Sequence, residues 1–156
     1  MTATAVITGG GTAGHVLPAL AIADALVAAG HAASSIHYVG SQRGVEARML
    51  PNTQYGHTLL DISGLQRSFT VSAIRRNAAL PVRLLRSLRA ARQLLRELRP
   101  NVVVNVGGYA SFPATWAARR LGIPYVVVSY DRRPGLVSRM MAKRAAACAV
   151  AFPGLS

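Results

Sequence analysis

Short apolar runs alternate with longer amphipathic stretches along nearly the whole chain. The short runs are four to six residues long and several are rich in valine and isoleucine, which predicts strands at 4–7, 36–39, 58–62, 102–106, 125–128 and 147–152. Between them, apolar residues recur at helical spacing, which predicts helices over 14–29, 45–50, 81–99 and 111–121, and one carrying Arg139, Lys143 and Arg144. Strands alternating with helices in this way predict an α/β domain with a Rossmann-like, doubly wound parallel sheet.

A glycine-rich turn follows the first predicted strand. Residues 8–15 contain four glycines, and Gly9, Gly11 and Gly14 have the spacing G-x-G-x-x-G. Glycine allows positive φ and close approach of the backbone, and the next helix directs its free N–H groups and positive dipole end at the turn. The turn therefore predicts binding of an anion such as a diphosphate, although the same spacing also marks plain strand-to-helix turns.

A dinucleotide is one possible ligand of this turn. NAD-binding domains place an acidic residue at the end of the second strand to hold the ribose, whereas this chain continues from Val39 into Gly40, Ser41, Gln42 and Arg43. The sequence disfavours NAD for this reason. Ser41 and Arg43 are suited to a 2′-phosphate, so an NADP-binding oxidoreductase domain is an alternative.

A second glycine loop follows the predicted strand 102–106. It begins with Gly107 and Gly108, and Ser111 is placed to cap the next helix, with Pro113 in its first turn. Ligands of doubly wound sheets bind outside the carboxyl ends of the strands, where the strand order reverses. We therefore expect the two glycine loops to face one cleft that takes a phosphate or diphosphate.

The charge of the chain is strongly positive, with 18 basic and 5 acidic residues and a net charge of +13. This balance predicts an anionic partner, although a genome biased toward arginine and alanine would produce it too. Aromatic residues are few and not interleaved with the arginines, which argues against nucleic acid. The helix over 81–99 sets arginines beside an apolar edge with Leu85 and Leu94, so a basic module that docks on membranes is a second alternative.

At 156 residues, the chain has the length of a single domain. No apolar run approaches the roughly 18 residues of a membrane span, and the first residues lack the charged start of a signal peptide, which predicts a cytoplasmic protein. Cys148 lies in an apolar stretch and is predicted to be buried. Glu46 is either a solvated carboxylate in the first turn of its helix or a functional group.

Motifs spread over most of the chain carry a family resemblance. They are G-G-T-A-G-H-x-x-P-A-L-A at 10–21, G-S-x-x-G-x-E at 40–46, G-L at 64–65, G-G-Y-A-S-x-P at 107–113, G-I-P at 122–124 and P-G-L at 134–136. In this order they resemble the N-terminal half of the MurG family, UDP-N-acetylglucosamine transferases that convert lipid I to lipid II in peptidoglycan synthesis.

The resemblance implies one half of a GT-B glycosyltransferase, in which two Rossmann-like domains face each other. Residues 1–156 would form a single domain that holds the lipid-diphosphate-linked sugar acceptor. The UDP-sugar would be held by a C-terminal domain that this chain lacks, so we expect either a piece of a longer enzyme or a subunit with a separate partner chain. The resemblance implies a peripheral protein at the inner face of the cell membrane and no cofactor or metal.

The resemblance also assigns roles to individual residues. His15 is implied as the catalytic base for the acceptor hydroxyl. The acceptor diphosphate is implied to bind Gly11, Thr12, Ala13, Gly14, Gly107, Gly108, Tyr109, Ala110 and Ser111. Contact with the anionic membrane surface is implied for Arg86, Arg89, Arg92 and Trp116.

The chain departs from the family pattern in two places. Ala13 stands where a glycine is usual, which changes the turn only slightly. At 128–131 the family has a histidine-glutamate-glutamine-asparagine run, whereas this chain has a valine followed by Ser129, Tyr130 and Asp131. In the family that run lines the active cleft, so the departure leaves the identity of the acceptor open. It is either the family's own acceptor or another lipid-linked or small-molecule acceptor.

Overall fold

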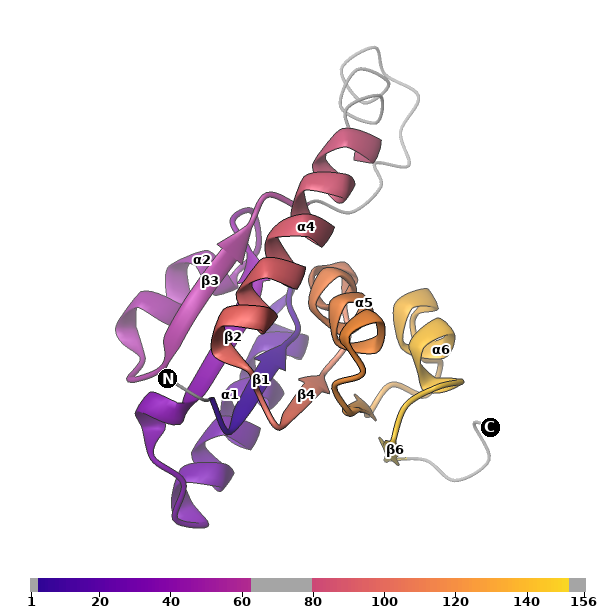
Figure 1. The fold of residues 1–156 in the computed structure, drawn as a ribbon. Coiled ribbons are helices and arrows are strands. Elements are labelled where there is room, and N and C mark those ends of the chain that lie inside the picture. Colours follow the sequence, from indigo (N-terminus) through magenta and orange to yellow (C-terminus); the bar gives the residue numbers. More distant parts are fainter. Residues whose placement is uncertain (1–2, 63–79, 152–156) are drawn as a thin grey trace.

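The computed structural model describes residues 3–62 and 80–151, and they form one parallel sheet with helices on both faces (Figure 1). The strands are β1 (Ala5–Thr8), β2 (Ile36–Ser41), β3 (Gly56–Leu60), β4 (Val102–Asn105), β5 (Tyr125–Ser129) and β6 (Ala147–Val150). The helices are α1 (Ala13–Ala28), α2 (Glu46–Met49), α4 (Leu80–Leu98), α5 (Phe112–Leu121) and α6 (Leu136–Ala142). The predicted α/β class is confirmed.

The strand order is β3-β2-β1-β4-β5-β6, and every neighbouring pair is parallel. In β1, Ile7 lies opposite Tyr38 of β2 on one side and Val104 of β4 on the other. The chain leaves the centre of the sheet in one direction after β1 and in the other after β4. The order therefore reverses between β1 and β4, where doubly wound sheets bind their ligands.

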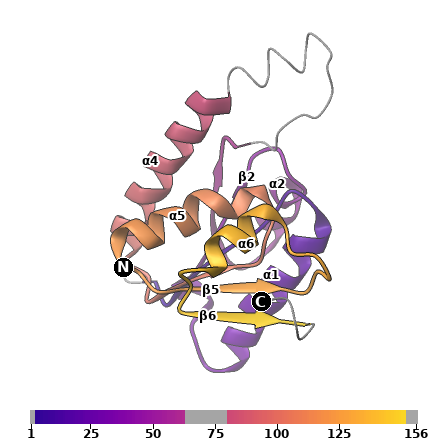
Figure 2. The same ribbon diagram turned by 90° about the vertical axis from the view of Figure 1, so that its right-hand side faces the viewer.

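Alternate residues of the central strands point into two separate cores. Val6, Val39 and Val103 pack under α4, α5 and α6, whereas Ile7 and Tyr38 pack with α1. Figure 2 shows α5 and α6 above β5 and β6, with α1 below them. The three consecutive valines that begin β4 follow from this burial on both faces.

Four expectations need correction or lie outside the described residues. The third strand begins at Gly56, before the predicted 58–62. Cys148 is exposed, as are all four residues of β6, which is an edge strand of the sheet. Ser111 does not cap α5 with its side chain: it ends a 3₁₀ turn over Tyr109–Ser111 that leads into the helix. The G-L motif at 64–65 lies outside the described residues.

Candidate active site

The two glycine loops touch each other at the switch point of the sheet. The Gly10 N–H donates to the Gly107 carbonyl oxygen at 3.3 Å. Gly108 has a φ of +79°, and a Cβ placed on it would lie 2.0 Å from the Gly10 carbonyl oxygen. A side chain at residue 108 would therefore both strain the backbone and force the two loops apart. The two loops therefore lie side by side, and the expectation that they face one ligand cleft stays a prediction.

Glu46 lies beneath the first loop and is completely buried. Its carboxylate accepts hydrogen bonds from the Gly11 N–H at 3.0 and 3.2 Å and from the Ser41 N–H at 2.8 Å. The reading of Glu46 as a solvated carboxylate is therefore wrong. Its backbone partners supply the donors that a buried carboxylate requires.

Three glycines surround this carboxylate and leave it room. A Cβ on any of them would come within 2.0 to 2.7 Å of a Glu46 side-chain atom; they are Gly10, Gly40 and Gly44. Such distances are far below van der Waals contact, so the glycines and the glutamate form one packed unit. The glycines of G-S-x-x-G-x-E are therefore explained by the glutamate in the same motif.

The bond to Glu46 revises which donors the first loop offers to a diphosphate. The Gly11 N–H already binds the carboxylate, so the expectation that Gly11 holds the diphosphate through this donor needs correction. Thr12, Ala13 and Gly14 are exposed at the start of α1. Within residues 3–62 and 80–151, the N–H groups of Ala13 and Gly14 have no acceptor, as is usual for a first helical turn.

The second glycine loop is held by a buried polar network that the sequence did not reveal. Asn105, fully buried at the end of β4, accepts the Gly107 N–H on Oδ1 at 2.8 Å and donates from Nδ2 to Thr115 at 2.9 Å. The Ser111 hydroxyl donates to the Gly108 carbonyl at 2.8 Å. An asparagine that interrupts an all-valine strand just before two glycines is the signal that could have pointed to this role.

Tyr38 supports the first loop from β2 and was also missed. Its hydroxyl donates to the Gly9 carbonyl at 2.9 Å. Burial raises the pKa of Tyr38, and the nearby Glu46 carboxylate raises it further, so the hydroxyl keeps the proton that it donates. A tyrosine within an apolar strand gives no sign of this contact in the sequence.

His15 lies between the two loops. A Cβ on Gly107 would be 3.1 Å from the His15 ring atoms Cε1 and Nδ1, and one on Gly108 would be 3.0 Å from Cδ2. The ring Nδ1 lies 2.8 Å from the hydroxyl of Tyr130, which follows β5. The structure thus brings together the implied catalytic histidine, both glycine loops and one residue of the divergent run.

The other expected cleft residues differ in their surroundings. Ser129 is buried at the end of β5, and its hydroxyl has no hydrogen-bond partner within the described part of the chain. Asp131 is exposed. Tyr109 lies against the first loop, since a Cβ on Gly11 would be 2.6 Å from the Tyr109 ring.

The residues proposed for a 2′-phosphate have partners inside the protein. The Ser41 hydroxyl donates to the Ile62 carbonyl at 2.7 Å, and the Arg43 guanidinium lies 3.2 Å from the Asp61 carboxylate. These contacts argue against the NADP alternative.

The arginines expected at a membrane lie outside the cleft, on the exposed face of α4. Arg86, Arg89 and Arg92 are exposed and share this face with Val82 and Leu85, whose surfaces are 52% and 54% exposed. Leu94, expected at the same edge, instead packs against the core. Within the described residues, no helix has both the length and the apolar character needed to cross a membrane.

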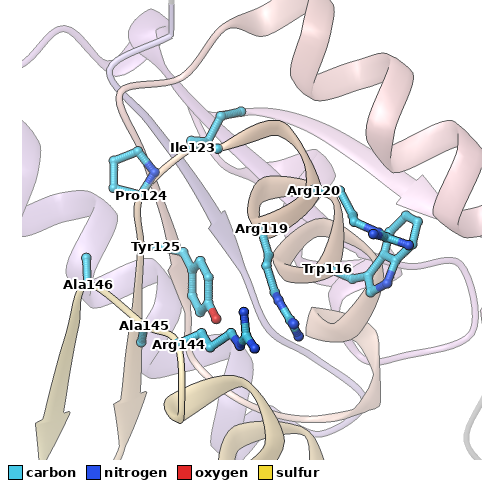
Figure 3. A pocket seen from close by; sticks show the side chains of 10 residues that line it. Trp116, Arg119, Arg120, Ile123, Pro124, Tyr125, Arg144, Ala145 and Ala146 are labelled. Atoms are coloured by element: carbon cyan, nitrogen blue, oxygen red, sulfur yellow. The ribbon is translucent and has the colours of Figure 1, made fainter.

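Trp116 lies on α5, beside a hollow at the amino ends of β5 and β6 (Figure 3). The hollow has a volume of about 790 Å³, and Arg119 and Arg144 point toward it near Tyr125. The Arg120 guanidinium stacks on the Trp116 ring at 5.4 Å from its centre. The hollow is at the opposite end of the strands from the glycine loops and does not belong to the cleft.

The fold and this site define a doubly wound α/β domain with two glycine loops and a histidine at its switch point. Residues 5–150 match the model of the glycosyltransferase family 28 N-terminal domain. The chain therefore belongs to glycosyltransferase family 28, within which it corresponds to the N-terminal domain.

Individual relatives agree with this assignment. Proteins named UDP-N-acetylglucosamine–N-acetylmuramyl-(pentapeptide) pyrophosphoryl-undecaprenol N-acetylglucosamine transferase are 42% identical in Thermus thermophilus and 39% identical in Streptomyces avermitilis, over 94% and 95% of this chain. The crystal structure of Acinetobacter baumannii MurG matches 96% of the chain with a TM-score of 0.81 and 28% identity. The chain spans only 39% to 41% of the length of these three proteins.

Proposed function

We propose that the chain is the acceptor-binding domain of an inverting glycosyltransferase of the MurG type. In the proposed reaction, N-acetylglucosamine passes from UDP to a hydroxyl of a lipid-diphosphate-linked sugar. The observation that carries the proposal is the seating of His15 between two glycine loops at the switch point of the sheet. The names of the relatives supply the sugar and the acceptor.

The cleft supports each part of this reaction. The N–H groups of Ala13 and Gly14 open a sixteen-residue helix, whose positive dipole end favours a diphosphate. His15 would take the proton of the attacking hydroxyl while the bond from the sugar to UDP breaks and UDP leaves. The net charge of +13 favours the approach of an anionic acceptor.

We propose further that the UDP-sugar is bound by a second domain outside these residues. The chain covers about 40% of its relatives, and the transfer needs a group that holds the donor opposite His15. The donor domain is either another part of the same protein or a separate chain. The described residues alone are therefore proposed to bind acceptor without catalysing transfer.

A titration tests acceptor binding. The domain is titrated by calorimetry with a short-chain lipid-diphosphate-sugar, NADPH and UDP-N-acetylglucosamine. We expect saturable binding of the diphosphate lipid and at least about tenfold weaker binding by Gly108→Ala, since its Cβ would displace the first loop. The matched control is Gly122→Ala, at a φ of +71° with no atom within 4 Å of the added Cβ.

The outcomes of this titration distinguish acceptor binding in the cleft from dinucleotide binding and from an effect of backbone strain. Loss of binding in the Gly108 variant but not in the Gly122 variant supports the cleft as the acceptor site. Binding of NADPH without any response to the diphosphate lipid would replace the transferase by the dinucleotide-binding alternative. Equal loss in both variants would show that backbone strain, rather than the contact between the loops, causes the effect.

For the exposed face of α4 we propose contact with the anionic inner face of the cell membrane. Exposed arginines beside Val82 and Leu85 combine charge attraction with apolar contact. Arg89→Glu should weaken sedimentation with vesicles that contain phosphatidylglycerol, and added salt should weaken it further. Arg48→Glu, which makes the same charge change on α2, is the control. If both variants bind as the wild type does, α4 is not the membrane surface.

A further inference from the structure

The hydroxyl of Tyr130 makes two polar contacts in the candidate active site. Its oxygen lies 2.8 Å from Nδ1 of His15, and it donates a hydrogen bond to the carbonyl oxygen of Gly14. The two rings are tilted by 50° with centres 6.1 Å apart, so they meet through these polar atoms and do not stack. The tyrosine thus joins the histidine to the backbone of its own helix.

Counting protons in these two contacts determines the state of the histidine. The Gly14 carbonyl can only accept, so it takes the single hydrogen of the Tyr130 hydroxyl. If that hydrogen pointed at His15 instead, two oxygen atoms would face each other lone pair to lone pair. The hydroxyl oxygen is therefore an acceptor toward Nδ1, and Nδ1 must carry a hydrogen.

We propose that Tyr130 is a positioning residue that holds neutral His15 in its Nδ1–H tautomer, so that the lone pair at Nε2 is the one that accepts the proton of the substrate hydroxyl. The role of that lone pair as catalytic base rests on the proposed function. The assignment of the tautomer does not, since it follows from the contacts of Tyr130 alone.

The surroundings of the ring agree with this assignment. A Cβ on Gly107 or Gly108 would come within 3.0 to 3.1 Å of ring atoms of His15, so the imidazole lies close beside these two glycines and has room there only because they carry no side chain. Within residues 3–62 and 80–151, no hydrogen bond engages Nε2. Burial raises the pKa of Tyr130 and the neighbouring Asp131 raises it further, so the hydroxyl stays protonated as a donor. Tyr109, from the second loop, also lies beside the first loop.

The sequence alone concealed this role because Tyr130 belongs to the run in which the chain departs from its family. Read as a departure, the tyrosine only casts doubt on the acceptor. In the structure it provides the contact that orients the histidine. Tyr130 would therefore hold the proposed catalytic base, His15, in place, although it differs from the residue that the family has at this position.

The tautomer can be read directly by NMR. The ¹⁵N-labelled domain is studied at about pH 9, above the range in which histidine side chains titrate, by two-bond correlations between the ring protons and nitrogens. We expect His15 of the wild type to show the Nδ1–H pattern. Free histidine prefers the Nε2–H tautomer, so this pattern would report a specific contact.

Two variants isolate the contribution of the hydroxyl. Tyr130→Phe should convert most of His15 to the Nε2–H tautomer, whereas Tyr109→Phe, which removes the hydroxyl of a tyrosine on the second glycine loop, should not. His37 serves as an internal control in each spectrum. Its Nε2 bonds to Thr58 at 2.8 Å, a contact between β2 and β3 in which neither Tyr130 nor Tyr109 takes part. Unchanged His37 signals show that a variant keeps its fold.

Each outcome decides the proposal. An Nε2–H pattern in the wild type, or an Nδ1–H pattern that survives Tyr130→Phe, would overturn it. Addition of the short-chain lipid-diphosphate-sugar should then shift the Nε2 resonance. If the tautomer is as expected and this ligand causes no shift, the positioning role stands and the proposed acceptor function fails.

Discussion

The Glu46 carboxylate offers the sharpest test of how the first glycine loop is held. It is completely buried, and it accepts from two backbone N–H groups, those of Gly11 and Ser41. Replacement of Glu46 by glutamine keeps the shape of the side chain but changes one acceptor oxygen into an NH₂ donor. Replacement by alanine removes every contact and leaves a cavity.

The hydrogen-bond distances around Glu46 indicate how much the free energy of unfolding should fall in Glu46→Gln. With the NH₂ group in place of Oε2, the Gly11 N–H keeps only its 3.2 Å bond to Oε1 and faces a donor at 3.0 Å. With the NH₂ group in place of Oε1, the Ser41 N–H loses its acceptor at 2.8 Å, which is worse. A hydrogen bond to a charged group contributes about 1.5–3 kcal/mol, so we expect Glu46→Gln to cost about 2 kcal/mol.

The alanine variant should cost more. Both backbone donors would be left without acceptors in a buried place and the side-chain volume would be lost, for which we expect about 4 kcal/mol. A domain of this size has a free energy of unfolding of about 5–15 kcal/mol, so the glutamine variant should still fold. The order wild type, glutamine, alanine is the expected ranking of stability.

Urea unfolding followed by circular dichroism measures these differences at constant m-value. Hydrogen exchange adds a local readout, because the Gly11 and Ser41 amides should exchange faster in Glu46→Gln. Glu97→Gln is the control: this exposed carboxylate on α4 accepts from Gln93 at 2.9 Å, and its loss should leave stability unchanged. A glutamine variant as stable as the wild type, with unchanged amide exchange, would refute the reasoning.

Three further predictions concern the supports of the cleft and the pH dependence. Asn105→Ala should lower the free energy of unfolding by about 2–3 kcal/mol in urea, because the buried Gly107 N–H loses its acceptor. Tyr38→Phe should cost about 1–2 kcal/mol in the same assay by leaving a buried glycine-loop carbonyl without its donor. Burial, with a smaller contribution from a neighbouring histidine, lowers the pKa of His37 from its ordinary 6.5, so the unfolded chain takes up this proton before the folded one does. Stability should therefore fall as the pH drops below 6.5, and His37→Gln should flatten this fall whereas His31→Gln, at an exposed position, should not.

The periodicity of apolar residues was sufficient to predict most of the fold. Valine-rich runs and amphipathic helices depend on local spacing, and their alternation implies a parallel sheet. The same local logic failed at the edge of the sheet. Cys148 lies in an apolar run that looks like a core strand, but burial depends on what packs against a strand in three dimensions, and all four residues of β6, at one edge of the sheet, are exposed.

The candidate site also has residues that the sequence predicts and residues that it does not. The glycine loops, His15 and the family are visible in the sequence because motifs record residue types at short spacing. Two partners of this site are not, since Tyr38 reaches the first loop from β2, Tyr130 reaches His15 from the residues after β5, and neither shows a pattern of its own. The sequence by itself therefore determined the class of fold, the family and the place of the two glycine loops at the ends of their strands. Only the tertiary structure decided that Glu46 binds the first loop and that Tyr130 contacts His15, because such contacts join residues 35 and 115 positions apart in the chain.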